Sequence, residues 1–212
     1  MTAARFLLSG FAVLATQFTL SAAVTLTLEN PGNVAYQQTL NSPCVIGESS
    51  CKNPAGFGEG DIPANTSPYD VSSPNYTVAQ IRAIVGNTFI VGIDVNTTTH
   101  PLATEQLDLF TLAINGIVQY IYDPASPGTQ LYTVNNGNGY SDELLKGFDL
   151  TAFAATDTVT FRAIVNNATD GREEFFLINT ATQAPTPEPT SVLLLGTALL
   201  FAGKLLKAKL VV

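Results

Sequence analysis

Residues 107–122 read LDLFTLAINGIVQYIY and decide the fold class of this chain. Two apolar runs, 107–114 and 117–122, flank the dipeptide Asn115-Gly116. Asn and Gly both accept positive φ angles, so this pair between apolar runs is the strongest short signal for a β-hairpin. The stretch therefore predicts two antiparallel strands joined by a tight turn.

Further short runs rich in β-branched and aromatic residues extend this pattern outward along the chain. They are Val24–Leu28, Val78–Val85, Thr88–Val95, Thr158–Val165 and Glu173–Ile178. Short strands separated by turn residues are typical of sandwiches and barrels. The sequence predicts an all-β domain over residues 24–180, an antiparallel β-sandwich of jelly-roll or immunoglobulin-like type. Residues 144–155 could hold one short helical turn.

Residues 41–76 differ in composition and contain both cysteines of the chain, Cys44 and Cys51. The segment is rich in Pro, Gly and Ser, which predicts a long irregular loop within the domain. Two cysteines at this spacing without companion histidines make a poor zinc site. In an exported protein they predict a local disulfide that holds a loop more than the whole fold.

Composition and charge exclude several functional classes. Acidic residues outnumber basic ones 17 to 9, and residues 24–184 alone carry 16 acidic and five basic residues. This balance argues against a nucleic-acid partner. Asp94, Asn96, Thr98 and Glu105 fall at EF-hand-like positions, but Thr99 replaces the required glycine, so the match is read as coincidence. No catalytic, metal or cofactor site is predicted, and the acidic residues are expected to form a solvated surface.

The N-terminus predicts a secretory signal peptide over residues 1–23. Arg5 supplies the positive charge, 6–20 is a mostly apolar stretch without charge, and small residues precede a cut after Ala23. An N-terminal core helix is the alternative, but such a helix would normally show a continuous polar face. Export through the general secretion route is therefore expected.

The C-terminus predicts a membrane anchor. A Pro-rich linker over residues 181–189 precedes an apolar stretch that begins at Thr190 and reaches Leu206 if Lys204 extends to the interface. This length is at the short limit of a transmembrane helix. Lys204, Lys207 and Lys209 follow, which places the C-terminus in the cytoplasm and the domain outside. The predicted anchor covers residues 190–209.

Together these features resemble the PEP-CTERM sorting signal of Gram-negative bacteria. The resemblance is confined to about residues 185–209: the triplet Pro187-Glu188-Pro189, a short Leu/Gly/Ala-rich helix and a basic end. It implies retention in the inner membrane facing the periplasm, processing by an exosortase-type membrane peptidase, and association with exopolysaccharide and biofilm genes. A plain C-terminal anchor with a Pro-rich neck is the alternative.

Two classes of function stay open for the β-domain. The first is a non-catalytic protein of the cell surface or extracellular matrix. The second is a carbohydrate-binding module, with extracellular polysaccharide as partner and exposed tyrosines stacking on sugar rings. The candidate tyrosines are Tyr69, Tyr76, Tyr120, Tyr122, Tyr132 and Tyr140. The absence of tryptophan weighs against the second class; an enzyme is the least expected.

Overall fold

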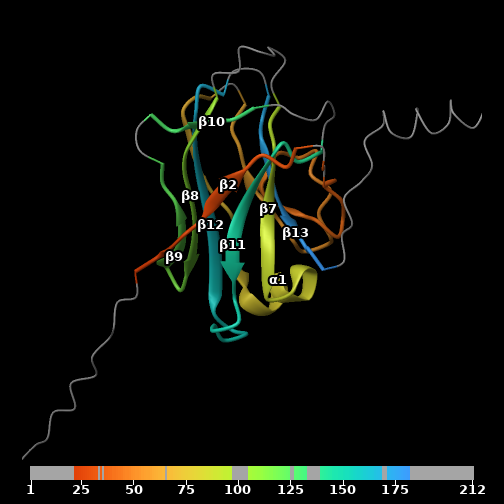
Figure 1. Ribbon diagram of the computed structural model, residues 1–212. Helices are drawn as coiled ribbons and strands as arrows, with labels where there is room; N and C mark the ends of the chain where they lie inside the picture. Colours follow the sequence, from red (N-terminus) through yellow and green to blue (C-terminus); the bar gives the residue numbers. More distant parts are fainter. Residues whose placement is uncertain are drawn as a thin grey trace, which may run out of the picture.

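Two mixed β-sheets pack face to face in the computed structural model of the chain (Figure 1). The structure describes residues 22–181 except 33, 35, 65, 97–104, 125–126, 133–138 and 169–170. The predicted signal peptide at 1–23, apart from Ala22 and Ala23, and the predicted anchor at 190–209 lie outside the described residues. The all-β prediction is confirmed for the described domain, whose one α-helix is short.

The first sheet is built around the predicted hairpin. Ile114 pairs with Ile117, and the turn residues Asn115 and Gly116 take φ angles of 51° and 77°. Its strand order is β1 (Val24–Thr25), β9 (Ile117–Tyr122), β8 (Gln106–Ile114), β12 (Thr158–Asn166) and β5 (Tyr69–Ser72). Two short strands join it at the side, β10 (Thr129–Gln130) on β8 and β6 (Tyr76–Thr77) on β12.

The second sheet contains the remaining strands. Its order is β2 (Thr27–Glu29), β11 (Glu143–Asp149), β7 (Thr88–Asp94), β13 (Glu174–Ile178), β3 (Cys44–Gly47) and β4 (Gly60–Asp61). Most pairs in both sheets are antiparallel, but β1–β9 and β3–β4 are parallel. The prediction of a purely antiparallel sandwich is therefore wrong at these two edge pairs.

Residues 78–85, predicted as a strand, form the helix α1 (Val78–Val85). Thr77 caps the helix: its Oγ1 accepts from the backbone N–H of Gln80, and the Gln80 side chain accepts from the Thr77 N–H. Gly86 ends it with a φ angle of 78°. One face is buried, through Val78, Ile81 and Val85. That spacing is helical, and together with a complete capping box it overrides the β-branched composition.

Two further expectations are corrected by the strands. Residues 144–149, expected to contribute to a helical turn, belong to β11. The segment 41–76, expected to be irregular, contains the short strands β3, β4, β5 and β6. Backbone pairing with longer neighbours, such as Phe176 of β13 with Cys44 of β3, makes these residues strands although their local composition does not favour a strand.

The strands give the sandwich two distinct ends. Helix α1 and the hairpin turn lie at one end, the α1 end; β7 starts there and finishes at Asp94 at the other end (Figure 1). β13 runs back and finishes at Ile178, so the described chain both begins and leaves toward the α1 end. Large buried side chains such as Phe110, Phe161 and Phe175 fill the space between the sheets.

Candidate functional site

The residues predicted to direct sorting lie outside the described part of the chain. These are Pro187, Glu188 and Pro189 of the motif and Lys204, Lys207 and Lys209 of the basic cluster. Ala23, after which the signal peptide is predicted to be cut, directly precedes β1. Within residues 22–181, as far as they are described, no helix is long and apolar enough to span a bilayer.

Cys44 and Cys51 form a disulfide with an S–S distance of 2.05 Å and a Cα–Cα distance of 6.0 Å. Cys44 is the first residue of β3 and is fully buried. It packs with Ile90, Leu144, Phe176 and Ile178 in a second apolar cluster, separate from the main core. The bridge therefore ties the turn at 48–51 to β3, whose first residue lies in this apolar cluster of the second sheet.

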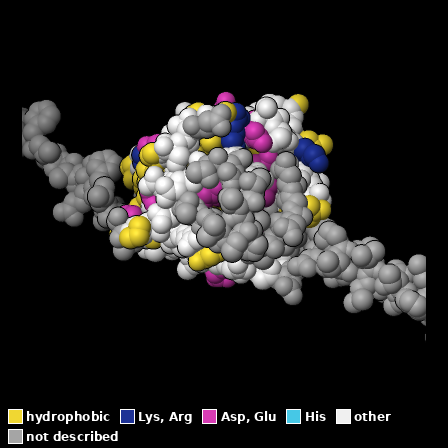
Figure 2. All heavy atoms as spheres, turned by 90° about the horizontal axis from the view of Figure 1, so that it is seen from above, with side chains coloured by type: hydrophobic (Ala, Val, Ile, Leu, Met, Phe, Trp, Pro, Cys, Tyr) yellow, Lys and Arg dark blue, Asp and Glu magenta, His cyan; other side chains and the backbone are white. Residues whose placement is uncertain are grey.

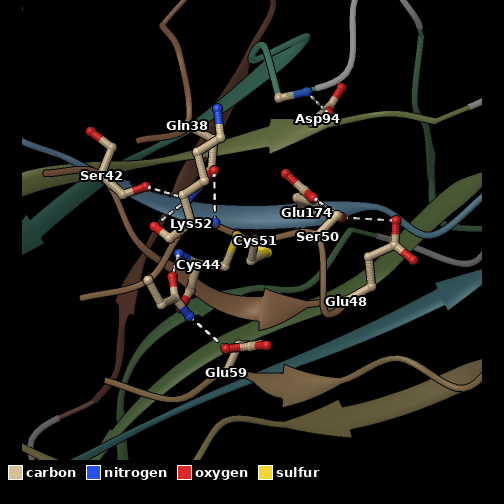
Figure 3. Close-up of a disulfide and its surroundings, with 12 residues drawn as sticks. Gln38, Ser42, Cys44, Glu48, Ser50, Cys51, Lys52, Glu59, Asp94 and Glu174 are labelled. Atoms are coloured by element: carbon tan, nitrogen blue, oxygen red, sulfur yellow. Dashed lines mark hydrogen bonds between the residues drawn. A yellow bond between two sulfur atoms is a disulfide. The ribbon is translucent and has the colours of Figure 1, made fainter. Parts of the chain in front are cut away.

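Polar contacts hold the disulfide segment in place (Figure 3). The Gln38 side chain accepts from the backbone N–H of Lys52 at 3.1 Å and donates to the Lys52 carbonyl at 2.9 Å. Ser50 Oγ lies 2.9 Å from Glu174 Oε1 and 3.0 Å from Glu48 Oε1, and its single proton can be donated to either carboxylate. The contact between Ser50 and Glu174 joins the segment to β13, and the bonds of Gln38 join it to the chain before β3.

A metal is not expected at this disulfide. Within the described residues, the one group of three potential ligands whose atoms lie within 4.8 Å of one another is Cys44, Cys51 and Glu174. Both sulfurs are bonded to each other and are no longer thiolates. Because the thiolate is the metal-binding form of cysteine, this group lacks its sulfur ligands.

The less expected feature is a set of buried carboxyl groups at the end of the sandwich opposite α1, here named the acidic end. Its members are Asp94, Glu105, Asp142, Glu143, Glu173 and Glu174, each at most 5% exposed. Viewed toward this end, Asp and Glu side chains are visible near the centre of the face (Figure 2). The expectation that the acidic residues form a solvated surface is wrong for these six.

Asp94 occupies the outer side of the second sheet at this end. It lies directly opposite Glu174 in the β7–β13 pair, and its Oδ2 accepts from the backbone N–H of Gly139 at 2.5 Å. Burial raises the pKa of Asp94 to about 8, and the nearby carboxyl groups of Asp142 and Glu174 add to the increase. Asp94 is therefore largely protonated at neutral pH, where an exposed aspartate is ionised.

A second subset faces the interior between the sheets. Side chains alternate along β13, so Glu173 lies on the same side as the core residue Phe175. Tyr69 of β5 donates its hydroxyl proton to Glu173 Oε2 at 2.5 Å, across the sandwich. Glu105 interacts with both: its charge contributes to the raised pKa of Tyr69, and a hydrogen bond between its carboxyl group and that of Glu173 opposes the effect of burial on the pKa of Glu173.

Glu173 is fully buried, and burial raises its pKa. Its Oε1 atom is also buried and has no hydrogen-bond partner among the described residues. Glu143, opposite Ile93 in the β11–β7 pair, has a pKa raised to about 7 by burial and by the charge of Asp142.

The EF-hand-like spacing does not correspond to one loop of ligands. Asp94 and Glu105 both reach the acidic end, but Asp94 pairs with Glu174 on the outer side while Glu105 adjoins Glu173 on the inner side. The Asn96 side chain donates to the carbonyl of Arg172 at 2.8 Å, and Thr98 lies outside the described residues.

The tyrosines do not form an exposed platform on either sheet. Tyr69, Tyr76 and Tyr120 are buried, and their hydroxyl groups donate to Glu173, to the Gly58 carbonyl and to the Asp149 carbonyl. Of the other three candidates, Tyr122 lies on β9, and Tyr132 and Tyr140 lie outside the named strands. Stacking on a sugar by three tyrosines of one sheet face is thus not available here.

Comparisons of the chain with protein-family models, with curated proteins and with solved structures found no match.

Proposed function

We propose that this protein is an exported, membrane-retained component of the cell surface or extracellular matrix, without catalytic activity, and a substrate of an exosortase-type peptidase. The observation that carries the proposal is the order of features at the C-terminus: Pro187-Glu188-Pro189, an apolar stretch, and three lysines. The predicted signal peptide supports it independently, because export and a C-terminal anchor facing the cytoplasm imply the same orientation.

Two features of the described domain support export. Both cysteines of the chain are joined in one disulfide, which is typical of oxidising compartments outside the cytoplasm. The predicted cleavage after Ala23 would remove nothing from β1, because this strand begins at Val24. The folded domain is therefore compatible with a mature chain that starts at residue 24.

The position of the chain's exit also supports an anchored domain. β13 finishes at Ile178 toward the α1 end, and the predicted linker at 181–189 follows directly. An extended Pro-rich spacer of this length spans about 25 Å, at ~3.1 Å per residue.

For the finer fold we propose a jelly-roll or immunoglobulin-like topology, for which two packed sheets of mostly antiparallel strands are the support. A carbohydrate-binding module is the second functional class, but the burial of Tyr69, Tyr76 and Tyr120 removes the stacking surface that would favour it.

Sorting and anchoring can be separated by two changes to the tail, followed in an exosortase-bearing host. Replacing Pro187, Glu188 and Pro189 with alanine leaves the apolar stretch intact, so membrane retention should persist while processing stops. Truncation after Ala184 should release the domain as soluble protein. Pro185→Ala, in the same spacer but outside the triplet, is the control and should be processed normally.

The readout is the size of the chain and its distribution between membrane and soluble fractions. Processing of the triple-alanine variant at the parental rate would reduce the tail to a plain anchor. Release of the full-length chain without truncation would refute anchoring as well.

A further inference from the structure

Exposed apolar side chains gather beside the hairpin turn at the α1 end. Ile117 and Val118 open β9 directly after the turn, and both are exposed, Ile117 to 54%. Val24 is 50% exposed and lies on the neighbouring edge strand β1, opposite Tyr120 of β9. Because Tyr120 follows Val118 by only two residues, the side chains of Val24, Ile117 and Val118 lie close together at the edge of the first sheet. We name these three residues the hairpin patch.

A fourth exposed apolar side chain belongs to the same end. Leu40 is exposed and lines a hollow of the surface together with Ala83 and Ile84 of α1. Among the described residues one further large apolar side chain is exposed, that of Tyr132. Its backbone N–H bonds to the carboxyl group of Glu143, at the acidic end. Exposed apolar residues scattered singly need no explanation, but these are concentrated at the α1 end.

Both predicted membrane segments join the domain at this end. The predicted signal peptide ends directly before Val24. β13 finishes at Ile178 toward the α1 end, and the linker at 181–189 leads from there to the predicted anchor. Since the extended linker spans only about 25 Å, it holds the α1 end near the bilayer. Such a tether gives a high effective concentration, at which even a weakly binding surface is occupied.

The charged groups at this end do not favour an anionic surface. Asp149 lies at the end of β11, and Asp157 directly precedes β12. The guanidinium of Arg82 donates to the carbonyls of Leu150 and Phe153, so it is already occupied. The partner that fits this end is therefore an uncharged, zwitterionic lipid surface, which the apolar side chains would contact.

We propose that the α1 end rests on the bilayer that holds the anchor, with the hairpin patch and Leu40 buried at the boundary between headgroups and acyl chains. The proposal rests on the anchored state proposed above and adds the orientation of the domain to it. The α1 end faces zwitterionic phospholipid, and the acidic end faces away from the bilayer. Because the contact is apolar, it should persist at high salt, which screens interactions between exposed charges.

The chain contains no tryptophan, so a single introduced tryptophan reports its own surroundings. The mature full-length chain, made in a host without exosortase, is reconstituted in nanodiscs of phosphatidylcholine that carries bromine atoms high on its acyl chains. Bromine quenches tryptophan fluorescence on contact. Ile117→Trp should be quenched at least about threefold more than Tyr132→Trp, because only the former reaches the acyl boundary. Tyr132→Trp is the matched control, an equally exposed position at the acidic end.

Two further substitutions test the patch itself. Val24→Asp and Val118→Asp, added to Ile117→Trp, should reduce quenching to the level of Tyr132→Trp, because buried carboxylates oppose the contact. Coelution of each chain with the nanodiscs reports anchoring separately. If the chains coelute but Ile117→Trp and Tyr132→Trp are quenched equally, or if quenching survives both aspartates, the orientation is refuted and the anchor stands. A chain that does not coelute refutes the anchor and this proposal with it.

Discussion

Replacing Asp94 with asparagine should make the protein markedly less sensitive to alkaline pH. Asp94 is buried, and the groups that face it include Asp142, Glu173 and Glu174, all of which disfavour its ionised form. Only the N–H of Gly139 favours the charged form, through the bond to Oδ2. An asparagine side-chain oxygen can accept the same bond, so the substitution removes the charge and keeps the contact.

The size of the effect follows from the two protonation equilibria. The pKa of Asp94 rises from 3.8 in an ordinary setting to about 8 in the folded protein. The folded state therefore holds the proton more tightly, so the contribution to stability is complete below pH 3.8 and declines as the pH rises toward 8. Between pH 5 and pH 8 linkage gives a loss of about 3.5 kcal/mol, or about 2.5 if the folded pKa is one pH unit lower.

Urea unfolding of the parent and the Asp94→Asn variant at pH 5 and pH 8, with EDTA present, measures this loss. The free energy of unfolding of the variant should fall by about 2.5–3.5 kcal/mol less than that of the parent over this interval. Asp61→Asn removes a carboxylate that is 78% exposed and should leave the parental pH dependence unchanged. An equal decline in the parent and Asp94→Asn would mean that Asp94 is already ionised in the folded state.

Three further changes test the packing of the domain. Reducing the Cys44–Cys51 bridge should lower the free energy of unfolding by about 2.5 kcal/mol, the chain-entropy value for so short a loop; urea melts with and without reductant measure it, and an unchanged midpoint would exclude a stabilising role. Gly92→Ala should destabilise by about 1–3 kcal/mol, because a Cβ there would lie 2.8 Å from Phe176 and Ile178 atoms. Gly58→Ala, whose Cβ would meet nothing closer than 3.7 Å, is its control; urea melts of both variants measure the two effects, and equal losses of stability would contradict the packing explanation. Thr77→Ala should cost about 1 kcal/mol by removing the cap of α1, and no change in stability would show that the cap is dispensable.

The elements that sequence reasoning identified correctly are those determined by local chemistry. Asn115-Gly116 specifies its turn through positive φ angles that both residues accept, and the structure has these angles. The alternating pattern of residues 158–165 predicts a strand with one buried face, and Val159, Phe161, Ala163 and Val165 are all buried. The disulfide also needed only two cysteines at close spacing.

Helix α1 was missed because composition was given more weight than spacing. Residues 78–85 contain Val and Ile, which favour strands, but a Thr-x-x-Gln capping box begins at Thr77 and a glycine follows at 86. Both signals are present in the sequence. The short strands in 41–76 are a different case, because β3 and β4 depend on pairing with each other and with β13, which no local pattern reveals.

The burial of the carboxyl groups at the acidic end could not be predicted from the sequence. Glu105, Glu143 and Glu173 are far apart along the chain, and each precedes or begins a strand, a position where an exposed carboxylate is unremarkable. Only the antiparallel register brings them to the same end. Leu107, two residues after Glu105, pairs with Val165, as does Tyr69, which binds Glu173. Glu174, the residue after Glu173, pairs with Asp94. A buried carboxyl group in these positions is tolerated if it is protonated, and therefore neutral, or if another group compensates its charge. Neither condition can be read from the residue type. The burial of these carboxylates is therefore a consequence of topology, since the strand pairing and not the local sequence decides which of them leave the solvent.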